Sequence, residues 1–217
     1  MKPIERLLAE KLLKISAIQL QPEMPFTWAS GWNSPIYTDN RRTLSYPELR
    51  TFIKIELCRL IMENFDAPDC IAGVATGAIA QGALVADELA VPYVYVRSTP
   101  KDHGLENLIE GNLGIGQKVV VVEDLISTGS SSLKVVDAIR HAGCEVAGMV
   151  AIFTYGFPQA EEAFNKANVK LLTLSNYNAL LEAALDTNYI KESDLLTLQE
   201  GRKNPAEWTA ASIAKSL

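Results

Sequence analysis

Four consecutive valines, residues 119–122, are the feature that most constrains the fold of this 217-residue chain. β-Branched residues favour strands, and an apolar run without polar alternation indicates a strand buried on both faces. Such strands occur in parallel sheets that are covered by helices on both sides. The rest of the chain should therefore supply crossover helices and further strands of the same sheet.

The chain from residue 70 onward shows this alternation of strands and helices. Five short runs rich in β-formers predict strands at residues 70–74, 92–96, 118–122, 145–153 and 169–174. Three stretches with helical spacing predict helices at residues 78–89, 131–142 and 159–166, the second of them ended by Gly143. The pattern predicts an α/β fold, a parallel sheet flanked by helices with right-handed crossovers.

The first 70 residues differ from the rest. They contain a helix at the N-terminus, a polar aromatic segment at 26–42 and a second helix at about 46–63. We interpret them as an N-terminal hood subdomain on the same unit, and residues 178–217 as helices that close the sheet. The chain is thus expected to form one domain over residues 1–217.

Composition narrows the classes of partner. With 48% hydrophobic and 21% charged residues the chain is globular, and its net charge is 20 − 26 = −6. This balance disfavours nonspecific binding to nucleic acid or to an anionic membrane. The three cysteines show no C-x-x-C spacing, and no apolar stretch reaches the ~18 residues of a membrane span. We therefore expect a cytoplasmic protein with free thiols and no membrane or nucleic-acid partner.

The segment that follows the valines carries the strongest functional signal. Glu123 and Asp124 stand at the carboxyl end of the predicted strand, where open α/β sheets bind ligands. The next residues, 127–131, read STGSS and open a helix; we call them the hydroxyl loop. Their hydroxyls, backbone amides and helix N-terminus are suited to phosphate.

Two carboxylates beside a phosphate site need a reason, because like charges repel. They fit if they accept hydrogen bonds from sugar hydroxyls, or if Mg²⁺ intervenes, so a ribose phosphate would satisfy the whole segment. The alternative is a solvated strand end with an ordinary helix cap.

Two other connections are candidates for function. About twenty polar, glycine-rich residues separate the strand ending at 96 from the one beginning at 118, which favours a functional lid. The turn at residues 74–78, VATGA, either offers backbone amides to pyrophosphate or is simply tight.

At these residues the chain resembles the type I phosphoribosyltransferases. The run VVVVEDLISTGSS resembles their motif for phosphoribosyl pyrophosphate (PRPP). Residues 26–42, FTWASGWNSPIYTDNRR, and residues 97–104, RSTPKDHG, resemble the N-terminal segment and mobile catalytic loop of the orotate phosphoribosyltransferases within that family. The resemblance covers nearly the whole chain.

The resemblance implies a reaction and its cofactor. Orotate N1 attacks C1 of PRPP, pyrophosphate leaves, and orotidine 5′-monophosphate forms for pyrimidine nucleotide synthesis. Mg²⁺ is expected to bind through PRPP and water, with no direct protein ligand. A homodimer is implied, with loop 97–116 shared across the interface.

The resemblance also implies residue roles. The catalytic residues would be Arg97, Lys101, His103 and Asp124. Besides those four, the residues expected to bind PRPP are Glu123, Leu125, Ile126, Ser127, Thr128, Gly129, Ser130 and Ser131. Orotate would contact Ser127, Ser30 and Tyr37. Residues 1–68 would recognise the base, and residues 69–217 would form the PRPP-binding core.

The chain departs from several members of the family in ways that remove cations. Ser98 replaces a basic residue, and Ala29 and Gly77 stand where some members carry lysine. Residues 154–157, TYGF, lack an arginine that contacts orotate in those members. Backbone amides could take over that role. Two alternatives stay open, a transferase for a purine base and a non-catalytic PRPP-sensing regulator.

Overall fold

The computed structural model describes residues 3–24, 26–27, 33–97 and 108–203. Its backbone divides into two compact units, Met1–Thr43 with Ser175–Leu217, and Leu44–Leu174. Among the described residues, no helix is both long enough and apolar enough to cross a membrane. The predicted assignment of base recognition to residues 1–68 and PRPP binding to residues 69–217 stays a prediction.

The second unit is built around a six-stranded sheet with the order β10-β9-β8-β5-β6-β7. Its strands are β5 (Cys70–Val74), β6 (Tyr93–Val96), β7 (Ile109–Glu110), β8 (Lys118–Ile126), β9 (Glu145–Thr154) and β10 (Leu171–Asn176). β5 pairs in parallel with β6 and with β8, and β8 pairs in parallel with β9. The predicted parallel sheet is therefore confirmed, and all four valines of β8 are fully buried in it.

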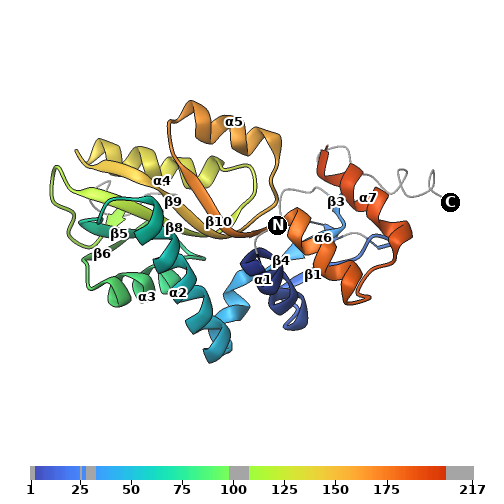
Figure 1. Cartoon of the computed structure of the whole chain (residues 1–217). Coiled ribbons are helices and arrows are strands. Elements are labelled where there is room, and N and C mark those ends of the chain that lie inside the picture. The colour runs from blue at the N-terminus through green and yellow to red at the C-terminus, as the bar shows by residue number, and fades with distance from the viewer. Residues whose placement is uncertain (1–2, 25, 28–32, 98–107, 204–217) are drawn as a thin grey trace. The chain divides into compact units, whose positions relative to one another are not determined.

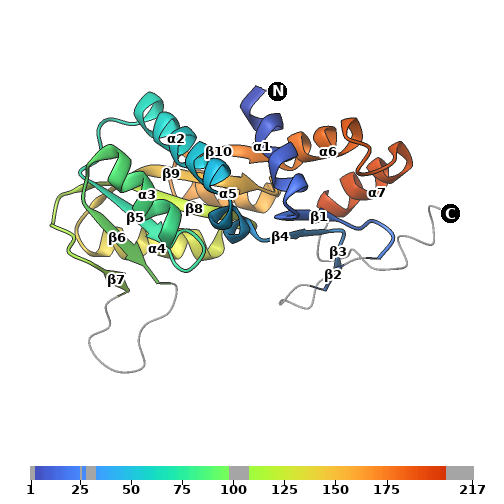
Figure 2. The same ribbon diagram turned by 90° about the horizontal axis from the view of Figure 1, so that it is seen from below.

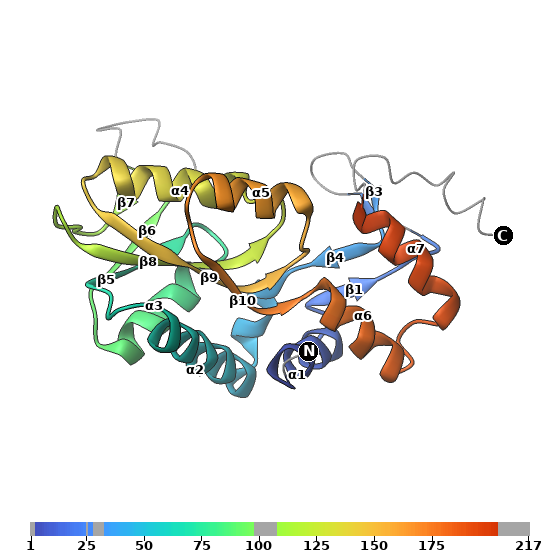
Figure 3. The same cartoon turned by 45° about the horizontal axis from the view of Figure 1, so that its top comes forward.

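Helices cover both faces of this sheet (Figures 1 and 3). α2 (Pro47–Asn64) and α3 (Ile79–Leu89) lie on one face, and α4 (Ser130–His141) and α5 (Pro158–Lys166) lie on the other. The apolar sides of these helices supply the partners that a strand buried on both faces requires. The three predicted crossover helices are confirmed to within a residue or two at their ends.

The two-residue strand β7 was not predicted. It pairs antiparallel with the outer strand β6, so that Tyr95 lies opposite Glu110 and Val96 opposite Ile109. Figure 2 shows β7 beside β6 at this edge of the sheet. The connection between residues 96 and 118 therefore returns to the edge of the sheet at β7, before β8 begins.

The first unit contains the two ends of the chain. Its elements are α1 (Pro3–Lys14), β1 (Ile18–Leu20), β2 (Phe26–Thr27), β3 (Asn33–Ser34), β4 (Ile36–Thr38), a 3-10 helix at Asn40–Ser45 that runs into the second unit, α6 (Tyr177–Asp186) and α7 (Glu192–Lys203). β1 pairs antiparallel with β4, and β2 with β3. The C-terminal helices, expected to close the sheet, instead share a unit with α1, and α6 packs along α1.

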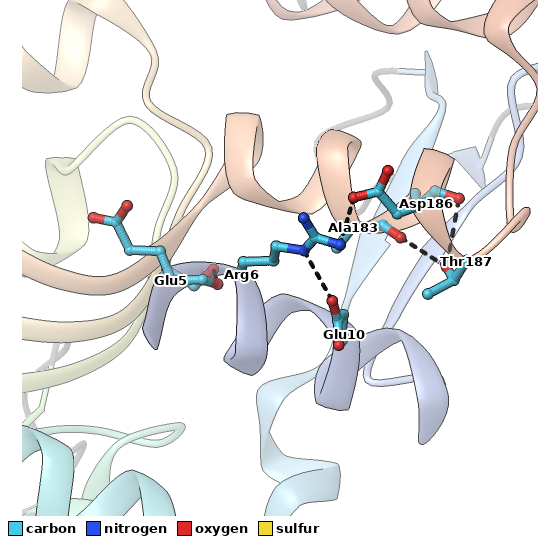
Figure 4. Close-up of polar contacts among 8 residues, drawn as sticks. Glu5, Arg6, Glu10, Ala183, Asp186 and Thr187 are labelled. Atoms are coloured by element: carbon cyan, nitrogen blue, oxygen red, sulfur yellow. Dashed lines mark hydrogen bonds and ion pairs between the residues drawn. The ribbon is translucent and has the colours of Figure 1, made fainter. Parts of the chain in front are cut away.

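An ion pair between Arg6 and Asp186 connects α1 to α6 at their surface, with local contacts within each helix beside it (Figure 4). Arg6 Nε lies 3.0 Å from Glu10 Oε1, and Arg6 Nη2 lies 2.5 Å from Asp186 Oδ2. Thr187 Oγ1 donates to the Ala183 carbonyl at 2.7 Å. Because exposed ion pairs contribute only ~0–1 kcal/mol, the buried leucines of α1 supply most of the stability of this contact.

Candidate functional site

The strand order places the candidate site at the carboxyl ends of β5 and β8. The chain moves from β5 to β6 on one side and from β8 to β9 on the other, so the strand order reverses between β5 and β8. Open parallel sheets bind ligands at such a switch point. The turn after β5 and the hydroxyl loop after β8 therefore share one edge of the sheet.

β8 is longer than the sequence predicted. It was expected to end at Val122, but it continues to Ile126 because its parallel ladder with β9 continues, with Glu123 opposite Ala151 and Leu125 opposite Phe153. Glu123 and Asp124 are thus inside the strand, where neighbouring side chains point to opposite faces. The two acids therefore have different surroundings.

Glu123 is the buried member of the pair, with 4% of its surface exposed. Ser132 Oγ donates to Glu123 Oε2 at 2.8 Å, and the Asp124 N–H donates to Glu123 Oε1 at 2.9 Å. Burial, followed by repulsion from the Asp124 carboxylate, raises the pKa of Glu123 from 4.5 to about 8. Near neutral pH this carboxyl group therefore holds a proton for much of the time.

Asp124 is half-buried and lies against the turn after β5. A Cβ added to Gly77 would overlap the Asp124 carboxylate, so the space above Gly77 is where that carboxylate sits. Gly77 is one of the positions where some family members carry lysine. In this chain Gly77 has no side chain to compete with the Asp124 carboxylate for that space.

The turn after β5 offers few amides. The Ala75 N–H donates to the Val96 carbonyl at 2.9 Å, and the Ala78 N–H donates to the Val74 carbonyl at 3.0 Å. The other amides of the turn belong to Thr76 and Gly77, and the Ala75–Thr76 peptide bond is cis. An anion at this turn would therefore meet the middle of the turn and the N-terminus of α3.

The hydroxyl loop leads directly into α4, which begins at Ser130, one residue before its predicted start. Gly129 has φ +79°, and a Cβ there would lie 2.8 Å from the Phe164 ring, so both backbone and space require glycine. Ser130 and Ser131 are exposed in the first turn of α4, while Ser127 and Thr128 are half-buried. The loop thus presents hydroxyls and a helix N-terminus on one side, as an anion site needs.

Two residues predicted to bind PRPP belong to the ladder between β8 and β9. Leu125 lies opposite Phe153, and Ile126 lies opposite Thr154 and is fully buried. The Ile126 carbonyl accepts from the Tyr155 N–H at 3.1 Å. The Ile126 side chain therefore belongs to the core, so only its backbone could contribute to a site.

The predicted cationic loop is described only at its ends. Arg97 follows β6, and its Nη1 lies 3.8 Å from Glu110 Oε1 of β7. The Arg97 N–H donates to the Leu108 carbonyl at 2.8 Å, which closes the loop at its base. Lys101 and His103 lie outside the described residues, so their roles stay predictions.

The three residues predicted to contact orotate lie in different parts of the chain. Ser127 belongs to the second unit, whereas Tyr37 belongs to β4 of the first, and Ser30 lies outside the described residues. Tyr37 is 40% exposed as a residue, and its ring packs against Phe26, with 5.6 Å between ring centroids. Its role as an orotate contact stays a prediction.

A cavity of about 410 Å³ lies beside α5 and β10. Its wall includes Gly156, from the segment where the orotate-contacting arginine of some members is absent, and Phe164. The Phe164 ring also lies against Gly129, so this cavity is adjacent to the hydroxyl loop.

Ser132 is a site residue that the sequence did not reveal. The predicted motif ended at Ser131, and a serine in a first helical turn is ordinary. The contact between Ser132 and Glu123 could have been predicted by combining two patterns, the alternation of side chains along the strand and the position where the helix begins. Together they place both side chains in the layer between β8 and α4.

The protonation of Glu123 predicts how stability depends on pH. The folded state keeps this proton up to about pH 8, whereas the unfolded chain releases it near 4.5. The free energy of unfolding should therefore fall as pH rises between these values, by at most about 1.4 kcal/mol per pH unit from this group. Glu123→Gln should remove that component in urea unfolding at several pH values. Glu145→Gln, at an exposed residue of β9, is the matched control, and equal slopes for Glu123→Gln and wild type would contradict the account.

Comparison with known proteins agrees with this geometry. The family model described as "Phosphoribosyl transferase domain" matches residues 52–186. Orotate phosphoribosyltransferase from Bacteroides thetaiotaomicron is 70% identical over 97% of this chain and 99% of its own length.

Two crystal structures resemble the chain in three dimensions. Orotate phosphoribosyltransferase from Aeropyrum pernix has a TM-score of 0.74 and 28% identity, covering 85% of this chain and 99% of that one. The enzyme from Mycobacterium tuberculosis in complex with PRPP has a TM-score of 0.63 and 26% identity, covering 82% of this chain and 99% of that one. With its acids, hydroxyl loop and parallel sheet arranged as described, the chain belongs to the orotate phosphoribosyltransferases of the phosphoribosyltransferase family.

Proposed function

We propose that this protein transfers the 5-phosphoribosyl group of PRPP to N1 of orotate. The N1–C1 bond forms, the bond from C1 to the pyrophosphate oxygen breaks, and orotidine 5′-monophosphate is released for pyrimidine nucleotide synthesis. The observation that carries this proposal is that β8 brings Asp124 against the turn after β5 and leads straight into the hydroxyl loop. One short segment thereby carries both an acceptor for the ribose diol and a site for the phosphate, as binding of a ribose phosphate requires.

Asp124 and the hydroxyl loop would hold the two ends of the ribose phosphate. The half-buried carboxylate of Asp124 would accept hydrogen bonds from the ribose hydroxyls. The loop amides, the hydroxyls of residues 127–131 and the N-terminus of α4 would bind the 5′-phosphate. Glu123 supports this arrangement from beneath, since its carboxyl group binds the Asp124 N–H.

The cations at the start of loop 97–116 would act on the leaving group. As the C1–O bond breaks, positive charge develops on the ribose and negative charge on pyrophosphate. Arg97, Lys101 and His103 would stabilise that negative charge, and a closed loop would exclude water that otherwise hydrolyses PRPP. In a homodimer this loop would reach the site of the partner subunit.

Magnesium would bind with the substrate. Mg²⁺ prefers oxygen ligands and keeps several waters, and it commonly binds through substrate phosphates with one or two carboxylates. Mg²⁺ bound to PRPP would offset the charge of the pyrophosphate.

The free cysteines support a cytoplasmic location for the enzyme, because thiols stay reduced in that compartment.

The direct test follows the absorbance of orotate in the presence of PRPP and Mg²⁺, and repeats the assay with EDTA. We expect orotate to be consumed with Mg²⁺ and little turnover once the ion is chelated. A panel of purine bases serves as the control. Turnover of a purine in place of orotate, or PRPP binding without turnover of any base, would contradict the proposal.

Lys101→Ala should lower kcat about a hundredfold or more and leave the KM for orotate within about twofold. The reason is that a cation aimed at the leaving group acts mainly in the transition state. Steady-state kinetics with both substrates measures the two parameters. An unchanged kcat would remove Lys101 from the reaction.

Gly77→Ala should weaken binding of ribose 5-phosphate about tenfold, roughly 1.4 kcal/mol, because the new Cβ displaces the Asp124 carboxylate. Isothermal titration calorimetry measures this affinity. In an Asp124→Ala background no carboxylate remains to be displaced, so the same substitution should then have little further effect. Equal losses in both backgrounds would show that Gly77 acts by another route.

A further inference from the structure

A side-chain hydrogen bond joins the two segments that flank the hydroxyl loop. Ser132 is the third residue of α4 and Glu123 lies in β8, nine positions earlier in the chain. The Ser132 Oγ–Glu123 Oε2 distance is 2.8 Å, and both residues are buried, with 1% and 4% exposure. The bond therefore spans the hydroxyl loop from beneath and holds its two ends together.

The same carboxyl group also holds the backbone of the ribose-binding acid. Its second oxygen, Oε1, accepts from the Asp124 N–H at 2.9 Å. One oxygen of Glu123 thus binds the helix after the loop, and the other binds the strand before it. Movement of Glu123 would disturb both the loop and Asp124.

This contact is not an ordinary helix cap. The N-cap position of α4 is Gly129, and no side chain caps the helix there. Ser132 directs its hydroxyl to a carboxyl group of the neighbouring strand instead of to an amide of its own helix. Both partners are buried, so loss of the Ser132 hydroxyl would leave the Glu123 carboxyl group without this partner and away from water, which costs more than loss of an exposed hydrogen bond.

We propose that Ser132 is a positioning residue for PRPP: its hydroxyl holds Glu123 so that the hydroxyl loop and the Asp124 backbone are already in their binding arrangement when the substrate arrives. The inference rests on the proposed function of the site. A loop that is ordered in advance loses less conformational entropy on binding, so its affinity for the phosphate and the ribose is higher.

The test measures binding of ribose 5-phosphate by calorimetry, together with thermal unfolding. Ser132→Ala should raise the Kd about tenfold, the loss expected when one partner of a buried hydrogen bond is removed. In steady-state assays the KM for PRPP should rise similarly, while the KM for orotate stays within about twofold. Ser175→Ala is the matched control, because Ser175 is also a fully buried serine whose hydroxyl donates a hydrogen bond, to the Glu5 carbonyl at 2.7 Å. Both Ser175 and Glu5 belong to the first unit, whereas the hydroxyl loop belongs to the second. Ser175→Ala should lower the melting temperature and leave the affinity for ribose 5-phosphate unchanged.

A second variant decides the case if Ser132→Ala does not fold. Ser132→Cys keeps the shape and supplies a weaker donor, so it should give an intermediate Kd. Unchanged affinity for ribose 5-phosphate in the folded variants would overturn the inference, as would equal rises in the KM values of PRPP and orotate. If wild type binds ribose 5-phosphate and Ser132→Ala weakens it, but orotate is not consumed, then the proposed function fails while the positioning role of Ser132 stands.

Discussion

Parallel pairing of β5 with β8 is the constraint on which the candidate site depends. It brings two segments, separated by more than forty residues of sequence, to one edge of the sheet with matched ends. The turn after β5 then faces Asp124 of β8, and Gly77 of that turn lies directly against the Asp124 carboxylate. Neither the turn nor the acid could form this site alone, and the valines of β8 secure the pairing by their complete burial.

The two adjacent acids illustrate how one strand can give similar side chains different tasks. Because the strand continues through them, Glu123 enters the layer beneath α4, while Asp124 faces the turn after β5. Burial keeps a proton on Glu123 near neutral pH, which reduces the negative charge beside a site for phosphate. The repulsion that two carboxylates would otherwise exert on an anionic substrate is thereby limited to Asp124.

Much of the second unit was predictable from the sequence, because its signals are local. Unbroken Val and Ile runs indicated the parallel strands, and helical spacing indicated α3, α4 and α5. The predicted end of β8 was wrong because polar residues indicate a strand end locally, whereas pairing with a long neighbouring strand can extend the ladder past them. Packing of α6 along α1 joins residues far apart in sequence, so no local pattern predicts it. The Ser132–Glu123 bond spans only nine positions, but it depends on β8 extending past Val122, which the polar residues concealed.

The most direct measurement is a crystal structure of the protein with PRPP and Mg²⁺. The account predicts the 5′-phosphate in the hydroxyl loop at residues 127–131 and the ribose hydroxyls within hydrogen-bonding distance of Asp124, above Gly77. PRPP bound elsewhere on the protein, or bound with its ribose away from Asp124, would contradict it.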